Sequence, residues 1–106
     1  MIILTQKNFT KEVLESSKLV LVDFWAEWCF PCKLMLEILK KINETYGNRI
    51  KLGKLNIDEN PEISFEYGIE AVPSLLFFKN GKLVDKIVGV VSFEILTKRI
   101  EENLKK

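Results

Sequence analysis

The sequence contains no histidine, and only two cysteines, three prolines and five glycines occur among its 106 residues. Without an imidazole, the chain has no histidine general base, no Ser-His-Asp triad and no histidine-containing metal site. Any chemistry must therefore come from other side chains. The chain also contains no repeat, linker or low-complexity segment.

A large excess of either charge is also absent, and so is any long apolar run. The formal net charge is +1, which leaves no basic surplus for a phosphate backbone, so we expect no nucleic-acid partner. No apolar stretch approaches the roughly 18 residues that span a bilayer, and residues 1–7 do not resemble a leader. We therefore expect a cytoplasmic protein without membrane contact, although a secreted protein whose signal has been removed has the same appearance.

What the sequence does have is the pattern of one α/β domain over residues 1–106. Its 47% hydrophobic and 29% charged residues are ordinary for a globular protein. We expect strands at residues 2–4, 19–25, 50–57, 74–79 and 83–88, and helices at 8–16, 29–46, 61–67 and 93–104. Right-handed crossovers then place helices on both faces of the sheet. The predicted fold is a three-layer α/β/α sandwich, with a central mixed sheet of about five strands and four helices.

The strand at residues 19–25 and the dipeptide Asn80-Gly81 predict how the sheet is assembled. The strand is almost continuously apolar, which is typical of a central strand covered on both faces and parallel to its neighbours. Asn80-Gly81 lies between two apolar runs and is a strong hairpin signal. The last two strands should therefore be antiparallel, so the sheet should be mixed.

Helix-capping residue types occur before the last two predicted helices. Asn60 precedes a proline at an expected N-cap, and Ser92 is placed to cap the C-terminal helix. On that helix, Glu101 and Lys105 have the i,i+4 spacing of an exposed ion pair.

The only two cysteines, Cys29 and Cys32, form a Cys-x-x-Cys pair at a strand-to-helix junction. Residues three apart on a helix are neighbours, so the two sulfurs can form a disulfide. The helix N-terminus stabilises a thiolate, which predicts Cys29 as the exposed attacking sulfur and Cys32 as the shielded, resolving one. Pro31 suits the first turn, because its missing N–H has no intrahelical partner there.

A structural disulfide and half of a zinc site are the alternatives for this pair. Zinc prefers four ligands, and two thiolates without an imidazole would have to rely on carboxylates, so we expect no metal. A disulfide that closes a loop of this length stabilises little. Redox chemistry is the favoured interpretation.

Asp23 and Pro73 are unusual in their local sequence. Asp23 interrupts an apolar strand, where ionisation is costly unless the charge is paired, so its carboxyl is a functional candidate. A carboxylate that reaches solvent at the strand end is the alternative. Pro73 precedes a strand, where proline is tolerated, and its local sequence alone predicts a trans bond.

Along essentially its whole length, the chain resembles the thioredoxin family. The matching segments are residues 23–33 (Asp-Phe-Trp-Ala-Glu-Trp-Cys-Phe-Pro-Cys-Lys), 54–58 (Lys-Leu-Asn-Ile-Asp), 71–74 (Ala-Val-Pro-Ser), 78–81 (Phe-Lys-Asn-Gly) and 88–89 (Val-Gly). The resemblance implies the thioredoxin fold and a monomeric protein-disulfide reductase that carries electrons on its two thiols. It implies no bound cofactor, disulfide-containing protein substrates, and electrons supplied by a separate enzyme of the thioredoxin reductase type.

The resemblance also implies roles for the residues around the disulfide. Asp23 is expected to accept the proton of Cys32 during resolution, and Lys54 on the adjacent strand to modulate Asp23. For Lys54, a surface lysine with its ammonium in solvent is the alternative.

The same resemblance implies a substrate-binding surface beside Cys29. Pro73 is expected to be cis and to face the disulfide, while the backbone of Val72 pairs with an extended substrate segment. Trp28 and Gly89 are expected to complete the apolar docking surface.

Phe30 is a departure, because thioredoxins usually have glycine at this position. The dipeptide Phe30-Pro31 is expected to tune the reduction potential, and the absence of histidine from it favours the reducing side. The alternatives are a disulfide oxidase or isomerase on the same fold, and a noncatalytic interaction module that binds through Trp28, Val72 and Pro73. The intact cysteine pair argues against the module.

Overall fold

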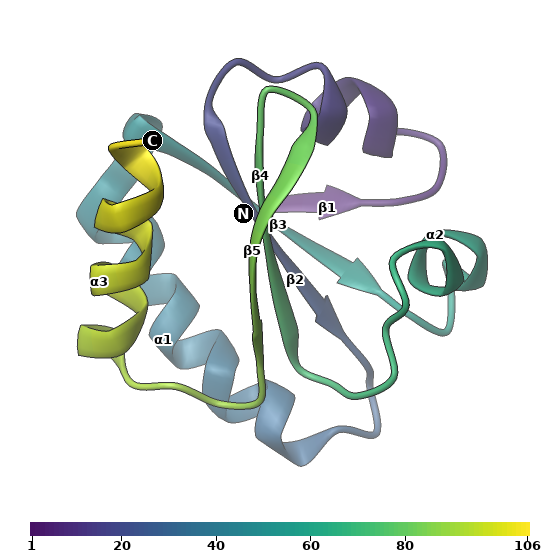
Figure 1. Cartoon of the computed structure of the whole chain (residues 1–106). Coiled ribbons are helices and arrows are strands. Elements are labelled where there is room, and N and C mark those ends of the chain that lie inside the picture. Colours follow the sequence, from purple (N-terminus) through teal and green to yellow (C-terminus); the bar gives the residue numbers. More distant parts are fainter.

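The computed structural model describes residues 1–106 and contains a five-stranded sheet with helices on both faces (Figure 1). The strands are β1 (Ile2–Leu4), β2 (Leu19–Trp25), β3 (Ile50–Asn56), β4 (Ser74–Lys79) and β5 (Lys82–Val88), and the helices are α1 (Phe30–Tyr46), α2 (Pro61–Glu66) and α3 (Phe93–Leu104). The first predicted helix is a short π-helical segment, Thr10–Leu14, and a 3-10 turn, Gly47–Arg49, follows α1. The predicted α/β sandwich is confirmed.

The sheet is mixed, as predicted, with strand order β1-β3-β2-β4-β5. β1 and β2 each pair with β3 in parallel, whereas β4 is antiparallel to both β2 and β5. The expectation that β2 is parallel to both of its neighbours was therefore wrong for β4.

The length of α2 explains this antiparallel pairing. A parallel crossover must carry the chain back along the sheet, and α1, with 17 residues, covers about 25 Å, which is enough. α2 has 6 residues and covers about 9 Å, against about 23 Å for a 7-residue strand. β4 consequently starts near the edge where β2 and β3 end and runs in the opposite direction.

The sheet separates two apolar clusters. α1 and α3 cover one face, and α2 with the Thr10–Leu14 segment covers the other (Figure 1). β2 contributes to both clusters, with Leu19 and Leu21 beneath α1 and α3, and Val20, Val22 and Phe24 on the opposite face. Because side chains alternate along a strand, Asp23 follows Leu19 and Leu21 on the face that α1 covers.

The predicted hairpin between β4 and β5 turns at Asn80 and Gly81, which have φ angles of 53° and 79°. Positive φ at both central residues is what a tight hairpin turn of this kind requires. A Cβ on Gly81 would lie 2.9 Å from the carbonyl oxygen of Leu14, so a larger residue is also sterically excluded there.

The capping prediction is confirmed for α3 but not for α2. The Ser92 hydroxyl accepts a hydrogen bond from the Ile95 N–H at 3.1 Å. Asn60 occupies the N-cap position of α2, but its Oδ1 accepts from the Gln6 N–H at 2.9 Å instead. The Gln6 side-chain oxygen in turn accepts from the Glu62 N–H at 2.8 Å. The loop after β1 thus caps α2.

The predicted ion pair between Glu101 and Lys105 does not form. Glu101 instead accepts a hydrogen bond from the Tyr46 hydroxyl at 2.7 Å and lies 3.7 Å from the Arg49 guanidinium. Its carboxylate therefore joins α3 to the end of α1. No helix of the structure has both the length and the apolar character needed to cross a membrane.

Candidate active site

The two cysteines lie at the edge of the sheet where β2 ends and β4 begins. Phe24 of β2 pairs with Ser74 of β4, and Ser74 pairs with Val88 of β5, so the segments on either side of these strands converge there. The N-terminus of α1 comes to the same edge directly after β2.

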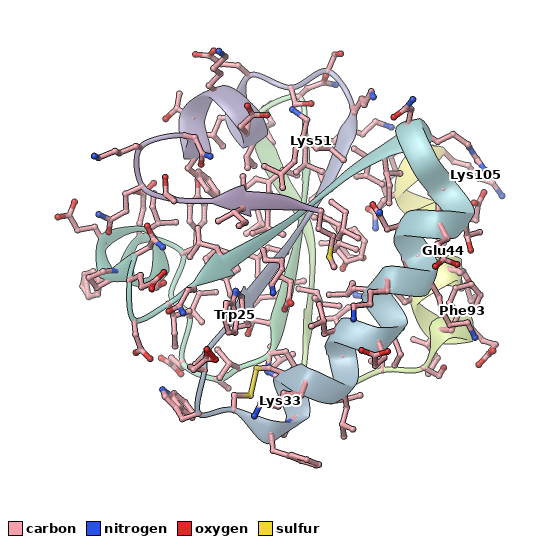
Figure 2. All side chains as sticks on the ribbon, turned by 180° about the vertical axis from the view of Figure 1, so that it is seen from behind. Trp25, Lys33, Glu44, Lys51, Phe93 and Lys105 are labelled. Carbon is pink, nitrogen blue, oxygen red and sulfur yellow. A yellow bond between two sulfur atoms is a disulfide. The ribbon has the colours of Figure 1, made fainter.

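Cys29 and Cys32 are joined by a disulfide, with their Cα atoms 5.3 Å apart (Figure 2). Cys29 is the N-cap residue of α1, and Pro31 lies in the first turn. The backbone N–H of Cys32 donates to the Cys29 sulfur at 3.2 Å, and the carbonyl oxygen of Val72 lies 3.6 Å from that sulfur. A donor aimed at this sulfur from a helix N-terminus stabilises negative charge on it once the disulfide is reduced.

The predicted difference in exposure between the two cysteines is wrong for the disulfide form. Cys29 is 3% exposed and Cys32 is 4% exposed, because the closed disulfide packs both side chains into one small cluster with Ala26. The two sulfurs differ in their surroundings instead. Cys29 faces Val72, whereas Cys32 faces a cavity on the α1 side of the sheet.

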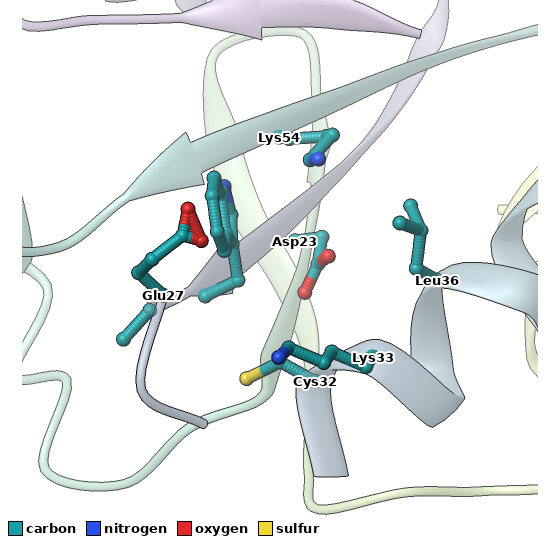
Figure 3. Close-up of a pocket in the computed structure, with 8 residues that line it drawn as sticks. Asp23, Glu27, Cys32, Lys33, Leu36 and Lys54 are labelled. Carbon is teal, nitrogen blue, oxygen red and sulfur yellow. The ribbon is translucent and has the colours of Figure 1, made fainter. Parts of the chain in front are cut away.

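That cavity, called here the Asp23 cavity, has a volume of about 290 Å³ and connects Cys32 with the buried end of β2 (Figure 3). The residues around it include Asp23, Glu27, Cys32, Lys33, Leu36 and Lys54. In Figure 3 the Asp23 carboxyl lies between Lys54 and Cys32. The cavity offers a route for a proton between the Cys32 sulfur and this carboxyl.

Asp23 is 1% exposed, and its Oδ1 has no hydrogen-bond partner. Burial raises the pKa of this carboxyl to about 7, and the positive charge of Lys54 partly opposes the increase. The alternative in which Asp23 reaches solvent at the strand end is therefore wrong. A carboxyl with this pKa exchanges protons near neutral pH.

Lys54 is the residue on β3 that pairs with Asp23 on β2, but the two do not form an ion pair. The Lys54 ammonium lies 4.4 Å from the centroid of the Trp25 ring instead, a cation–π contact. Lys54 lines the Asp23 cavity and is partly buried, so it differs from a fully solvated surface lysine.

On the other side of the disulfide, the chain around Pro73 forms a surface beside Cys29. The Val72–Pro73 peptide bond is cis, and the Pro73 carbonyl accepts a hydrogen bond from the Gly89 N–H at 2.8 Å. Gly89 has φ of 94°, which favours glycine, although a Cβ there would meet no neighbour. Cys29, Val72, Pro73 and Gly89 are thus brought together.

Two large aromatic side chains flank Cys29 in the sequence and are open to solvent. Trp28 is 70% exposed and Phe30, the first residue of α1, is 68% exposed. The Trp28 indole N–H donates to the Asp58 carboxylate at 2.9 Å, which fixes the ring orientation.

The family model described as thioredoxin matches residues 1–102. The chain belongs to the thioredoxin family. It is 43% identical over 100 residues to a thioredoxin of Chlorobaculum thiosulfatiphilum, with 94% of this chain and 93% of that protein covered. It is 48% identical over 102 residues to a thioredoxin of Buchnera aphidicola subsp. Schizaphis graminum, with 96% and 94% covered. A thioredoxin of Rickettsia felis is 50% identical over 86 residues, 81% of this chain and 82% of that protein.

As a member of the thioredoxin family with an intact Cys29–Cys32 pair, the chain is a thiol–disulfide oxidoreductase of the protein-disulfide reductase type. The site matches this chemistry, because the two sulfurs are within bonding distance and a helix N-terminus supports the first of them. No group of three or more Cys, Asp or Glu side chains is placed to hold a metal ion in this thioredoxin site or elsewhere.

Sequence reasoning missed several residues of this thioredoxin site. Glu27 and Lys33 line the Asp23 cavity, and their positions beside the cysteine motif were the available signal. Asp58, which holds Trp28, lies in the matching segment 54–58 but 30 residues away from its partner. The contact of Lys54 with Trp25 had no signal beyond the expected pairing of their strands.

Proposed function

We propose that this protein reduces disulfides in other proteins as a dithiol carrier, with Cys29 as the attacking sulfur and Cys32 as the resolving sulfur. The observation that carries the assignment is the 3.2 Å hydrogen bond from the Cys32 N–H to the Cys29 sulfur at the N-cap of α1. A backbone donor of this kind favours the thiolate of Cys29 over that of Cys32.

In the first step, the Cys29 thiolate attacks one sulfur of a substrate disulfide. A bond forms between Cys29 and that sulfur, and the second substrate sulfur leaves as a thiolate that takes a proton from water. The backbone of Val72 beside Pro73 aligns an extended substrate segment with Cys29, while Trp28 and Gly89 complete the docking surface.

In the second step, Cys32 attacks the Cys29 sulfur of the mixed disulfide. The Cys32 proton passes through the Asp23 cavity to the Asp23 carboxyl, and the sulfur bound to Cys29 leaves with the electron pair as the reduced substrate. A pKa of about 7 makes Asp23 a base of suitable strength at neutral pH, and Lys54 modulates it. Two electrons have then moved from the dithiol to the substrate.

A separate enzyme of the thioredoxin reductase type restores both thiols, and the protein itself needs no bound cofactor or metal. We place this cycle in the cytoplasm, in a single domain that acts as a monomer without nucleic-acid partners. The family membership and the bacterial sources of the relatives support this setting.

Insulin reduction driven by dithiothreitol tests the proposal. We expect the protein to accelerate precipitation of the reduced insulin chains well above dithiothreitol alone, and the Cys29→Ser variant to give no acceleration. If the wild-type protein does no better than buffer, the catalytic assignment is wrong and a noncatalytic binding module is favoured.

A further inference from the structure

Trp25 and Lys54 form a wall between two cavities. One is the Asp23 cavity, and the second, of about 170 Å³, lies toward β1 and includes Glu59 in its lining. Trp25 and Lys54 line both cavities. Their contact therefore separates the carboxyl of Asp23 on one side from that of Glu59 on the other.

The sheet geometry places the residues of this wall next to Asp23. Trp25 follows Asp23 by two positions on β2, so both side chains lie on the same face, and Lys54 pairs with Asp23 from β3. The Lys54 ammonium lies 4.4 Å from the Trp25 ring centroid and forms no ion pair with any carboxylate. The Asp23 Oδ1 remains without a partner although it is buried.

Lys54 is the charged side chain that affects the pKa of Asp23. Glu27, from the connection to α1, and Lys33 of α1 line the same cavity, while Leu75 of β4, which pairs with Asp23 on the other side, carries no charge. Lys54 is the group among these whose positive charge opposes the effect of burial on the pKa of Asp23.

We propose that Trp25 is a positioning residue whose indole face holds the Lys54 ammonium near Asp23 but out of contact with it. An ammonium in contact would keep the carboxyl ionised, and one drawn into solvent would leave the burial of the carboxyl unopposed. The indole therefore fixes the strength of the Lys54 effect between these limits. The inference rests on the proposed role of Asp23 as the proton acceptor for Cys32.

The test is a pH titration of the Asp23 carboxyl in single and double variants. The titration is monitored by carbon-13 NMR on the disulfide form. Trp25→Leu and Trp25→Phe are each measured with Lys54 present and with Lys54→Met, and Asp23→Asn identifies the signal. We expect Trp25→Leu to lower the titration midpoint by about half a pH unit, because the freed ammonium approaches Oδ1. Trp25→Phe keeps a weaker π face and should give a smaller shift.

The Lys54→Met background distinguishes two roles of Trp25. Trp25 could position the Lys54 ammonium, or it could only exclude water from Asp23. If Trp25 acts through Lys54, the shift caused by Trp25→Leu should fall to less than half in that background. An equal shift in both backgrounds, or no shift in either, overturns the proposal. If Trp25→Leu does not fold, the same comparison with Trp25→Phe decides.

The outcome is separable from that of the proposed function. The titration needs no turnover, so it remains decisive even if the protein does not reduce insulin. Conversely, a failed double-variant comparison leaves insulin reduction by the wild-type protein in place.

Discussion

Two aspartates on the same sheet have opposite environments. Asp23 of β2 has an unpartnered Oδ1, and burial raises its pKa to about 7. Asp85 of β5 accepts hydrogen bonds from Arg99 Nε at 2.8 Å, Asn103 Nδ2 at 2.9 Å and the Lys86 N–H at 2.8 Å. Chiefly because of the hydrogen bond from Arg99, the pKa of Asp85 falls to about 2.

The difference shows how the same fold leaves one carboxyl able to exchange a proton and uses another to hold two elements together. A buried carboxyl with few partners has its neutral form favoured and gains or loses a proton readily near neutral pH, whereas donors on several sides hold the charge in place. Asp85 thereby ties β5 to α3, whereas Asp23 lines the cavity that Cys32 also borders. We call Asp85 with Arg99 and Asn103, on the side of the outer strand β5, the anchoring end, and Asp23 with the Cys29–Cys32 disulfide, where β2 ends, the reactive end.

The largest expected effect comes from removing each sulfur at the reactive end in turn. Cys29→Ser should abolish attack on substrate, because it removes the attacking sulfur, which accepts the hydrogen bond from the Cys32 N–H. Cys32→Ser should still attack but cannot resolve, so mixed disulfides through Cys29 should accumulate as bands on a nonreducing gel. Dithiothreitol should remove them. Trapping by Cys29→Ser alone would instead reverse the two roles.

Asp23→Asn should separate reactivity from stability. The substitution keeps the shape but removes the base, so resolution of the mixed disulfide should slow about 10²-fold in single-turnover experiments while the initial attack persists. Unchanged release of the reduced substrate would remove Asp23 from the mechanism.

The same variant should be more stable than the wild type at high pH. The folded pKa of Asp23 lies above its unfolded value of 3.8, so the contribution of Asp23 to wild-type stability is fully present below about pH 4 and is lost as pH rises toward 7. Asp23→Asn lacks this decline and should gain about 2–4 kcal/mol in the free energy of unfolding at pH 8, measured by denaturant titration. Parallel pH profiles for the two proteins would contradict the raised pKa.

At the anchoring end, Asp85→Asn should lower stability and leave insulin reduction unchanged. Loss of the charge-assisted hydrogen bonds should cost about 1–3 kcal/mol in the free energy of unfolding at pH 7. Because the folded pKa of about 2 lies below the unfolded value of 3.8, the wild-type advantage should be present above about pH 4 and disappear as pH falls toward 2. An advantage that persists at pH 2 would show that the charge of Asp85 is not its source.

The smallest effect is expected from Phe30, which is the first residue of α1, next to Cys29, and does not line the Asp23 cavity. Phe30→Gly should make the reduced loop more flexible, so closing the disulfide costs more entropy and the reduction potential should become less negative by roughly 10–20 mV. Phe30→Ala is the control, because it removes the ring but keeps a restricted backbone, and it should shift the potential less. Equal potentials in a glutathione titration would exclude a tuning role.

The elements set by local pattern were predictable from the sequence. The apolar run at residues 19–25 became β2, and Asn80-Gly81 became the hairpin turn, because strand burial and positive φ angles depend on neighbouring residues. Asp23 was identifiable for the same reason, since its apolar neighbours on one strand already imply burial.

Features that depend on distant partners were not predictable. The Gln6 cap of α2, the contact of Glu101 with Tyr46, and the antiparallel pairing of β2 with β4 all join segments far apart in the chain. Asp85 gave no signal, because its partners Arg99 and Asn103 lie 14 and 18 residues away on another element. The similar burial of the two cysteines follows from how the closed disulfide packs, which residue spacing alone does not determine.

The reciprocal hydrogen bonds between the loop after β1 and α2 have a consequence for local opening. The Asn60 side chain accepts from the backbone N–H of Gln6, and the Gln6 side chain accepts from the backbone N–H of Glu62. Neither segment can therefore detach unless both hydrogen bonds break. The two amides should therefore exchange their hydrogens with deuterium at matching rates, as one cooperative unit that opens independently of the reactive end.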